Sequence, residues 1–278
     1  MTDFQQDDFD NWLAANRPGS KKTEMDPLSR FMGALADGTP VVLNSTLTGA
    51  NAQQAMEKDA AYSSAPPGPP AVEALKQSPA TGASMIMTLA QEQSGYNPSD
   101  PAQLGSASMF MTYINQVLQC PLYSTVINDI VNLQLSGSWD HGIDQILGYY
   151  VGIPQRDLDT IRESLVTVAA AASSNPSTNQ VTNLFAQATL SAGDTIDAYM
   201  YQSNVVMRST RHSGGKNQPD YTTNQANMSL HRVQLRFDQA NWPSQAENVY
   251  NATHQSLSDW LAGGSTPTGD LPDNWAPR

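Results

Sequence analysis

The clearest structural signal in this chain is the segment Ser229-Leu230-His231-Arg232-Val233-Gln234-Leu235-Arg236-Phe237-Asp238. Its polar and apolar residues alternate, which is the period of a β-strand that presents different chemistry on its two faces. Residues 196–211 also favour a strand. We therefore predict that residues 196–211 and 227–238 pair as an antiparallel hairpin around a mobile loop at 212–226.

The alternation also predicts which side chains of this hairpin are buried. Val233, Leu235 and Phe237 share one face, and we expect that face to contact helices. Arg232 and Arg236 share the other face, where we expect solvent or a partner. A register error of one residue would exchange the two faces, so the pattern specifies the pairing as well as the strand.

The segments before the hairpin are predicted to be mainly helical. Residues 107–119 form an apolar stretch, and we expect helix to resume after Pro121. The helical spacing that supports these segments is seen in three sets of apolar residues, namely Leu122, Val126, Ile130 and Leu133; Leu158, Ile161, Leu165, Val168 and Ala172; and Val181, Leu184, Phe185 and Ala188. Ser244 and Glu247 match a capping box that would begin a last helix.

The predicted class is therefore α+β, mainly helical with a small antiparallel β-sheet toward the C-terminus. A further short strand is expected around Val41-Val42-Leu43. We divide the chain into a polar N-terminal arm at residues 1–25, a single α+β domain at 26–262 and a C-terminal tail at 263–278. Within the domain, residues 63–70 are expected to form a rigid proline-rich connector.

The composition favours contacts made through uncharged polar groups. Charged residues make up 14% of the chain, against about 25% in typical globular proteins. Asn, Gln, Ser and Thr together number 89 of 278 residues. Such surfaces exclude water from a contact without desolvating charge. The net charge of −12 argues against nucleic acid as a partner, because phosphate contacts need clustered Lys and Arg.

The cellular location is left open by the sequence. The N-terminus, Met1-Thr2-Asp3-Phe4-Gln5-Gln6-Asp7-Asp8, is acidic where a signal peptide needs a basic start and an apolar run. No segment offers the ~20 apolar residues of a transmembrane helix. We therefore expect a protein without a transmembrane segment that resides in a virion, in the cytoplasm, or outside the cell after leaderless secretion.

Cys120 is the one candidate nucleophile. If Pro121 began a helix, the helix dipole would favour the thiolate at its N-terminus. His141 could then act as a base, and Asp144 could orient it, in acyl transfer or thioester hydrolysis. The same thiol could instead carry a fatty acyl group, or act simply as a small apolar side chain in the core. Phosphate loops, dinucleotide fingerprints and metal-binding motifs are absent, so no cofactor or metal is expected.

Two functions follow from these observations. The first is a non-enzymatic structural or interaction protein, such as a virion or secreted-assembly subunit, with protein partners or self-assembly. The alternative is an acyl-handling Cys enzyme, or an S-acylated lipid-binding virulence factor or toxin that uses Cys120. In being acidic with one thiol in an apolar segment, the chain is similar to lipid-modified bacterial virulence factors, but no motif carries this likeness.

Overall fold

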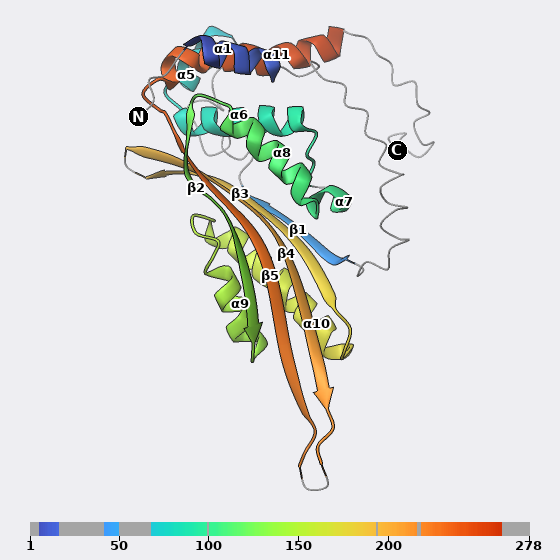
Figure 1. Ribbon diagram of the computed structural model, residues 1–278. Coiled ribbons are helices and arrows are strands. Elements are labelled where there is room, and N and C mark those ends of the chain that lie inside the picture. The colour runs from blue at the N-terminus through green and yellow to red at the C-terminus, as the bar shows by residue number, and fades with distance from the viewer. Residues whose placement is uncertain are drawn as a thin grey trace, which may run out of the picture.

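The computed structural model describes residues 6–16, 42–49, 68–98, 100–192, 194–215 and 218–262, with the backbone alone for 42–49, 192 and 254–262. A five-stranded sheet forms the middle layer, and helices pack on both of its faces (Figure 1). The fold is α+β, which confirms the predicted class. Within the described part of the chain, no helix is both long and apolar enough to cross a membrane.

The sheet has the strand order β1-β3-β4-β5-β2, so β1 and β2 form its two edges. β1 runs parallel to β3, and the other neighbouring pairs are antiparallel. The strands are β1 (Val42–Gly49), β2 (Tyr123–Ser136), β3 (Gln180–Ala192), β4 (Thr195–His212) and β5 (Tyr221–Phe237).

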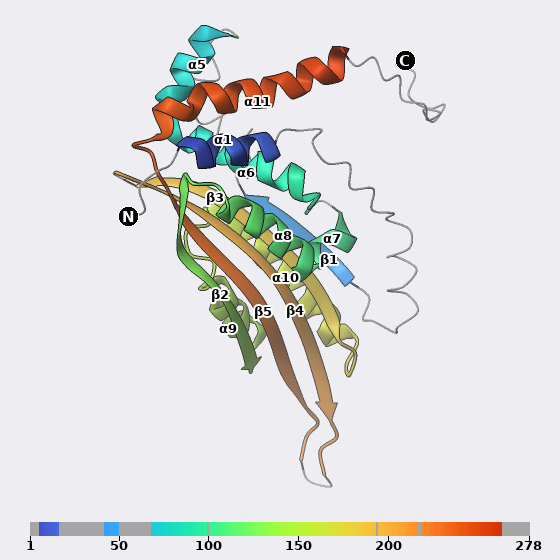
Figure 2. The same ribbon diagram turned by 45° about the horizontal axis from the view of Figure 1, so that its top comes forward.

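Two groups of helices cover the sheet, and each encloses a core of its own (Figure 2). The first core lies under α1 (Gln6–Ala15), α5 (Pro69–Lys76), α6 (Pro79–Ser94), α7 (Pro101–Leu104), α8 (Ala107–Leu118) and α11 (Trp242–Ala262). The second core lies under α9 (Trp139–Leu147) and α10 (Gln155–Ser174). Successive strand residues point to opposite faces, so Leu184 enters the second core and Phe185 the first.

The predicted hairpin is confirmed, with β4 and β5 paired from Ile196–Phe237 to His212–Tyr221. The three apolar residues assigned to the helix-facing side are buried in the first core. Arg232 and Arg236 lie on the other face, where they pair with Asp129 and Asp197. β5 begins at Tyr221, so the connection is shorter than the predicted loop of residues 212–226.

Two predicted helices are wrong, because residues 123–133 and 181–188 lie in β2 and β3. In β2 the spacing of Val126, Ile130 and Leu133 imitates a helix, yet alternate residues from Val131 onward pack against the second core. Residues 181–188 of β3 are buried on both faces, so apolar and polar residues do not alternate along this run. Such a run cannot be distinguished from a buried helix by periodicity.

Part of the predicted arm packs on the domain. Phe9, Trp12 and Leu13 of α1 are buried in the first core, and the indole N–H of Trp12 donates to the carbonyl of Gln116, 2.9 Å away. Pro69 begins α5, while residues 63–67 of the expected connector and the tail at 263–278 lie outside the described residues.

Two predicted boundaries can be compared with the structure. β1 starts at Val42, within the strand expected near Val41-Val42-Leu43. The last helix is present, but α11 begins at Trp242. Ser244 therefore lies inside the helix, where its hydroxyl donates to the carbonyl of Asn241, and the predicted capping box is wrong.

Candidate functional site

Cys120 lies in the first core, just beyond the C-terminal end of α8, and is 1% exposed. Its backbone N–H donates to the carbonyl of Val117, and its carbonyl accepts from the N–H of Tyr123. Pro121 begins no helix, because β2 follows, so the expected N-terminal dipole is missing. Burial raises the pKa of the Cys120 thiol well above its ordinary value, since loss of water disfavours the charged form. The thiol is therefore protonated at neutral pH.

His141 and Asp144 lie on α9, on the other side of the sheet from Cys120. His141 is exposed, and its Nε2 lies 3.1 Å from Nε2 of Gln145. A carboxylate oxygen of Asp144 accepts from Arg162 of α10 at 2.6 Å. The structure therefore does not bring the three predicted catalytic residues together, and the sheet separates the thiol from the imidazole.

The other histidines in the described hairpin have structural surroundings. His212 stacks on Tyr221 near the end of β4, with ring centroids 4.6 Å apart. Nε2 of His231 lies 2.9 Å from Oδ1 of Asn128, and its ring contacts that of Phe110. Among the described residues, no three His, Cys, Asp or Glu side chains cluster in a way that would hold a metal ion.

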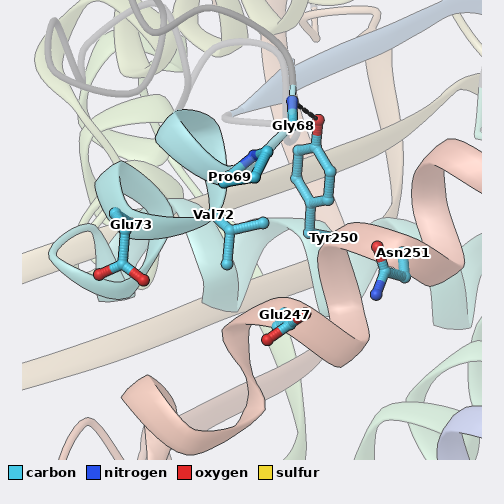
Figure 3. A pocket seen from close by; sticks show the side chains of 7 residues that line it. All are labelled: Gly68, Pro69, Val72, Glu73, Glu247, Tyr250 and Asn251. Atoms are coloured by element: carbon cyan, nitrogen blue, oxygen red, sulfur yellow. Dashed lines mark hydrogen bonds between the residues drawn. The ribbon is translucent and has the colours of Figure 1, made fainter.

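A shallow hollow of about 270 Å³ lies between the start of α5 and the middle of α11 (Figure 3). Tyr250 forms one wall, and its hydroxyl accepts the N–H of Gly68 at 2.9 Å. Glu73 is paired with Lys76 at 2.7 Å, and Glu247 lies at the opposite side of Val72 (Figure 3). The hollow lacks a nucleophile next to a base, so its residues do not form a recognisable catalytic arrangement.

One face of the sheet carries a group of exposed polar residues among the described strands. Directly paired residues of neighbouring strands point to the same side, and the pairs Asn132–Ser229 and Ser229–Asn204 continue the face that carries Val233. We call this surface the amide face. It consists of Asn128, Ile130, Asn132 and Gln134 of β2, Gln225, Asn227 and Ser229 of β5, and Asn204, Val206 and Arg208 of β4.

The amide face is exposed although the reverse side of the same strands is packed. Ile130 is 62% exposed, and Asn132 and Asn227 are also exposed. Leu230 and Met228, on the reverse side, are buried in the second core under α9 and α10. Both Figure 1 and Figure 2 show the lower ends of β2, β4 and β5 extending past α8.

The chemistry of the amide face is that of neutral hydrogen bonding. Arg208 is its one charged residue. Within the described part of the chain, the side chains of Asn132, Gln134 and Asn227 make no hydrogen bond, so their donors and acceptors are available to a partner. The abundance of amides is evident in the sequence, but this surface was not predicted, because residues of β2 were assigned to a helix. The strict alternation in Val131-Asn132-Leu133-Gln134-Leu135-Ser136 was the signal that could have located it.

Comparison with known proteins gives little guidance. No family model matches this chain, and no curated protein matches its sequence. Among solved structures it is similar to the Evf virulence factor, with a TM-score of 0.34 and 10% identity over 81% of this chain and 80% of that one. It is also similar to a delta-endotoxin, with a TM-score of 0.33 and 9% identity over 70% of this chain and 80% of that one. Both similarities are too distant to carry a function.

Proposed function

We propose that this chain is a non-enzymatic interaction protein, a subunit of a larger assembly such as a virion or a secreted complex, and that the amide face is its contact surface. The observation that carries the proposal is the change in chemistry across one sheet. Three long strands are packed on one side and present exposed amides and hydroxyls on the other.

Neutral amides suit such a contact for an energetic reason. A buried polar group is tolerated when it finds a hydrogen-bond partner, whereas a buried charge must be paired at a much higher desolvation cost. On a chain with a net charge of −12, a nearly uncharged face is also where approach of another acidic molecule meets least repulsion. Ile130 adds an apolar contact within this face.

The test is the native mass of the protein isolated from its source. We expect a mass well above the 30.0 kDa of one chain, measured by light scattering. A variant that charges the amide face, Asn132→Asp with Asn227→Asp, should reduce that mass while leaving the far-ultraviolet circular dichroism unchanged. The matched control carries the same added charge on exposed helical positions, Asn11→Asp with Gln145→Glu, and should assemble as the wild type does.

Two results would contradict the proposal. Native material that runs at the mass of one chain would show that no assembly exists. An assembly that tolerates the charged amide face as well as it tolerates the control would place the contact elsewhere on the molecule. In both cases the fold must be intact, so each variant is first compared with the wild type in thermal unfolding.

The alternative function based on Cys120 remains a hypothesis, and the same material tests it. An acyl group on this thiol would add its mass to the intact chain, and hydroxylamine would remove it. In the structure the thiol is buried, and burial raises its pKa, so acylation or catalysis would require the helices over the first core to move away. An intact mass equal to that of the sequence would argue against acylation.

A further inference from the structure

We infer that the free edge of β2 pairs with the β2 edge of a second copy of this chain, so that two five-stranded sheets join into one. This inference goes beyond the proposed function, because it concerns the backbone edge of the sheet and not the amide face. Among the described residues, β2 is an outer strand of the sheet and is bonded to β5 on one side only. Half of its backbone N–H and C=O groups therefore point away from the sheet, as at every edge.

The edge lacks most of the features that prevent such pairing. Natural edges are shortened, bent by bulges, or protected by charged residues and proline. β2 has 14 residues and includes no proline, no lysine and no arginine. Its single irregularity lies between Thr125 and Ile127, which leaves residues 127–136 regular.

Electrostatics favour this edge as a place where two acidic chains can meet. Each copy has a net charge of −12, so most of its surface repels another copy. Asp129 is the only charged residue of β2. Both of its carboxylate oxygens accept from Arg232, at 2.9 and 2.6 Å, so the edge is locally neutral.

The side chains select one register for the pair. In an antiparallel pair related by a two-fold axis, a residue on the axis faces its own copy. An axis at Asp129 would oppose two carboxylates, which is unfavourable. An axis at Ile130 instead brings together the most exposed apolar side chains of the strand, each 62% exposed in one copy. It also places Asn128 opposite Asn132, where the two amides can hydrogen-bond, and Asp129 opposite Val131.

A contact along one strand edge is narrow, so we expect a weak dimer with a Kd on the order of micromolar. Sedimentation of the purified full-length chain over a concentration series should show this equilibrium. Ile130→Lys would oppose two ammonium groups on the axis, and we expect it to raise the Kd at least about tenfold. Val151→Lys is the matched control, because Val151 is 61% exposed and lies in the turn after α9.

A second variant tests the register through the formation of a covalent bond, and not through a loss of dimer affinity. Residues on the axis have Cβ atoms about 5 Å apart, close enough for a disulfide after a small shift. In a Cys120→Ala background, Ile130→Cys should therefore form a covalent dimer under mild oxidation. Asn132→Cys should not, because residues four positions apart along the paired strands are separated by roughly 13 Å.

The outcomes separate this inference from the proposed function. A purified chain that stays monomeric, while native material remains a larger assembly, would overturn the β2 pairing and leave the proposed function in place. Native material at the mass of one chain, together with an Ile130→Cys crosslink in the purified chain, would contradict the proposed function and leave the β2 pairing in place. A monomer in which the β2 amides that point away from β5 also resist hydrogen exchange would mean that another segment of the same chain covers the edge, which would also overturn the pairing.

Discussion

The two ends of β5 differ in what covers them, although their odd-numbered residues point to the same face of one strand. Val233, Leu235 and Phe237 lie under helices and are at most 3% exposed. Asn227 and Ser229, further toward the hairpin end, are exposed on the amide face. The residue type thus changes from apolar to amide or hydroxyl at the point where the helical layer ends. One strand therefore contributes both to a core and to a contact surface.

The largest effect should come from truncating the covered end. Leu235→Ala removes a fully buried side chain from the first core and should cost about 2–5 kcal/mol of unfolding free energy, because a cavity remains. Asn227→Ala, on the same strand and face, should change it by less than about 0.5 kcal/mol. Urea unfolding of both variants measures the contrast. Equal effects would mean that the two ends of β5 are not packed differently.

A second pair of variants compares the two helical layers. A Cβ added at Gly82 of α6 would lie 2.1 Å from the ring of Trp242, which is fully buried and donates its indole N–H to the carbonyl of Leu75. Gly82→Ala should therefore destabilise the fold by about 1–3 kcal/mol. A Cβ at Gly142 of α9 meets no atom within 4 Å, so Gly142→Ala should gain up to about 1 kcal/mol of helix propensity.

Thermal unfolding of the two glycine variants should thus give shifts of opposite sign. A stabilising Gly82→Ala would contradict the close contact between α6 and the start of α11. A destabilising Gly142→Ala would mean that α9 lies closer to its neighbours than the structure has it. The pair is matched, since both glycines are buried and both lie within helices.

The sequence predicted the parts of this fold in which one face differs chemically from the other. β5 could be predicted as a strand because arginine and glutamine alternate with apolar residues. β3 could not, because both of its faces are buried and the alternation of polar and apolar residues disappears from such a strand. The docking of α1 could be expected from Phe9, Trp12 and Leu13, but nothing in the sequence says which surface receives them. Contacts between distant segments decide that.

The candidate site was less predictable than the fold. The amide content pointed to uncharged contacts, but only the register of β2 against β5 gathers Asn132, Gln134 and Asn227 on one exposed face. Cys120, His141 and Asp144 were predicted as a catalytic set because their side chains are chemically reactive and they are close in sequence. Sequence distance is a poor guide across a sheet, whose two sides are separated by a layer of backbone. The connection from α8 through β2 to α9 carries the chain from one side to the other.

A smaller effect is expected at Cys120, which lies in the first core under the helices. Because burial keeps its thiol protonated, the folded chain should react with a thiol reagent at neutral pH far more slowly than the unfolded chain. Cys120→Ala should cost on the order of 1 kcal/mol, near the typical effect of a point mutation. Labelling kinetics followed by mass spectrometry measure the first expectation. Rapid labelling of the native chain would mean that the first core opens readily, and would favour the alternative function.

The smallest effect is expected at the boundary between the two ends of β5, where His231 lies against Phe110. Its Nε2 lies 2.9 Å from Oδ1 of Asn128, the first residue of the amide face on β2. Burial lowers the pKa of His231 below its ordinary value of 6.5, because loss of water disfavours the charged ring, and Asp129 opposes this change. Arg232 already pairs with Asp129. This ion pair limits how much the carboxylate can stabilise a protonated His231 ring.

The sign of the resulting pH dependence follows from proton binding. As the pH falls through 6.5, the unfolded chain takes up a proton at this histidine before the folded chain does, so the folded state loses stability. Other groups titrate in the same range, and His231→Gln removes only this contribution. The wild type should therefore lose more unfolding free energy than the variant between pH 7.5 and pH 5. A His231→Gln slope equal to that of the wild type would mean that this end of the first core is open to water, and the boundary between covered and exposed strand would have to be placed closer to Val233.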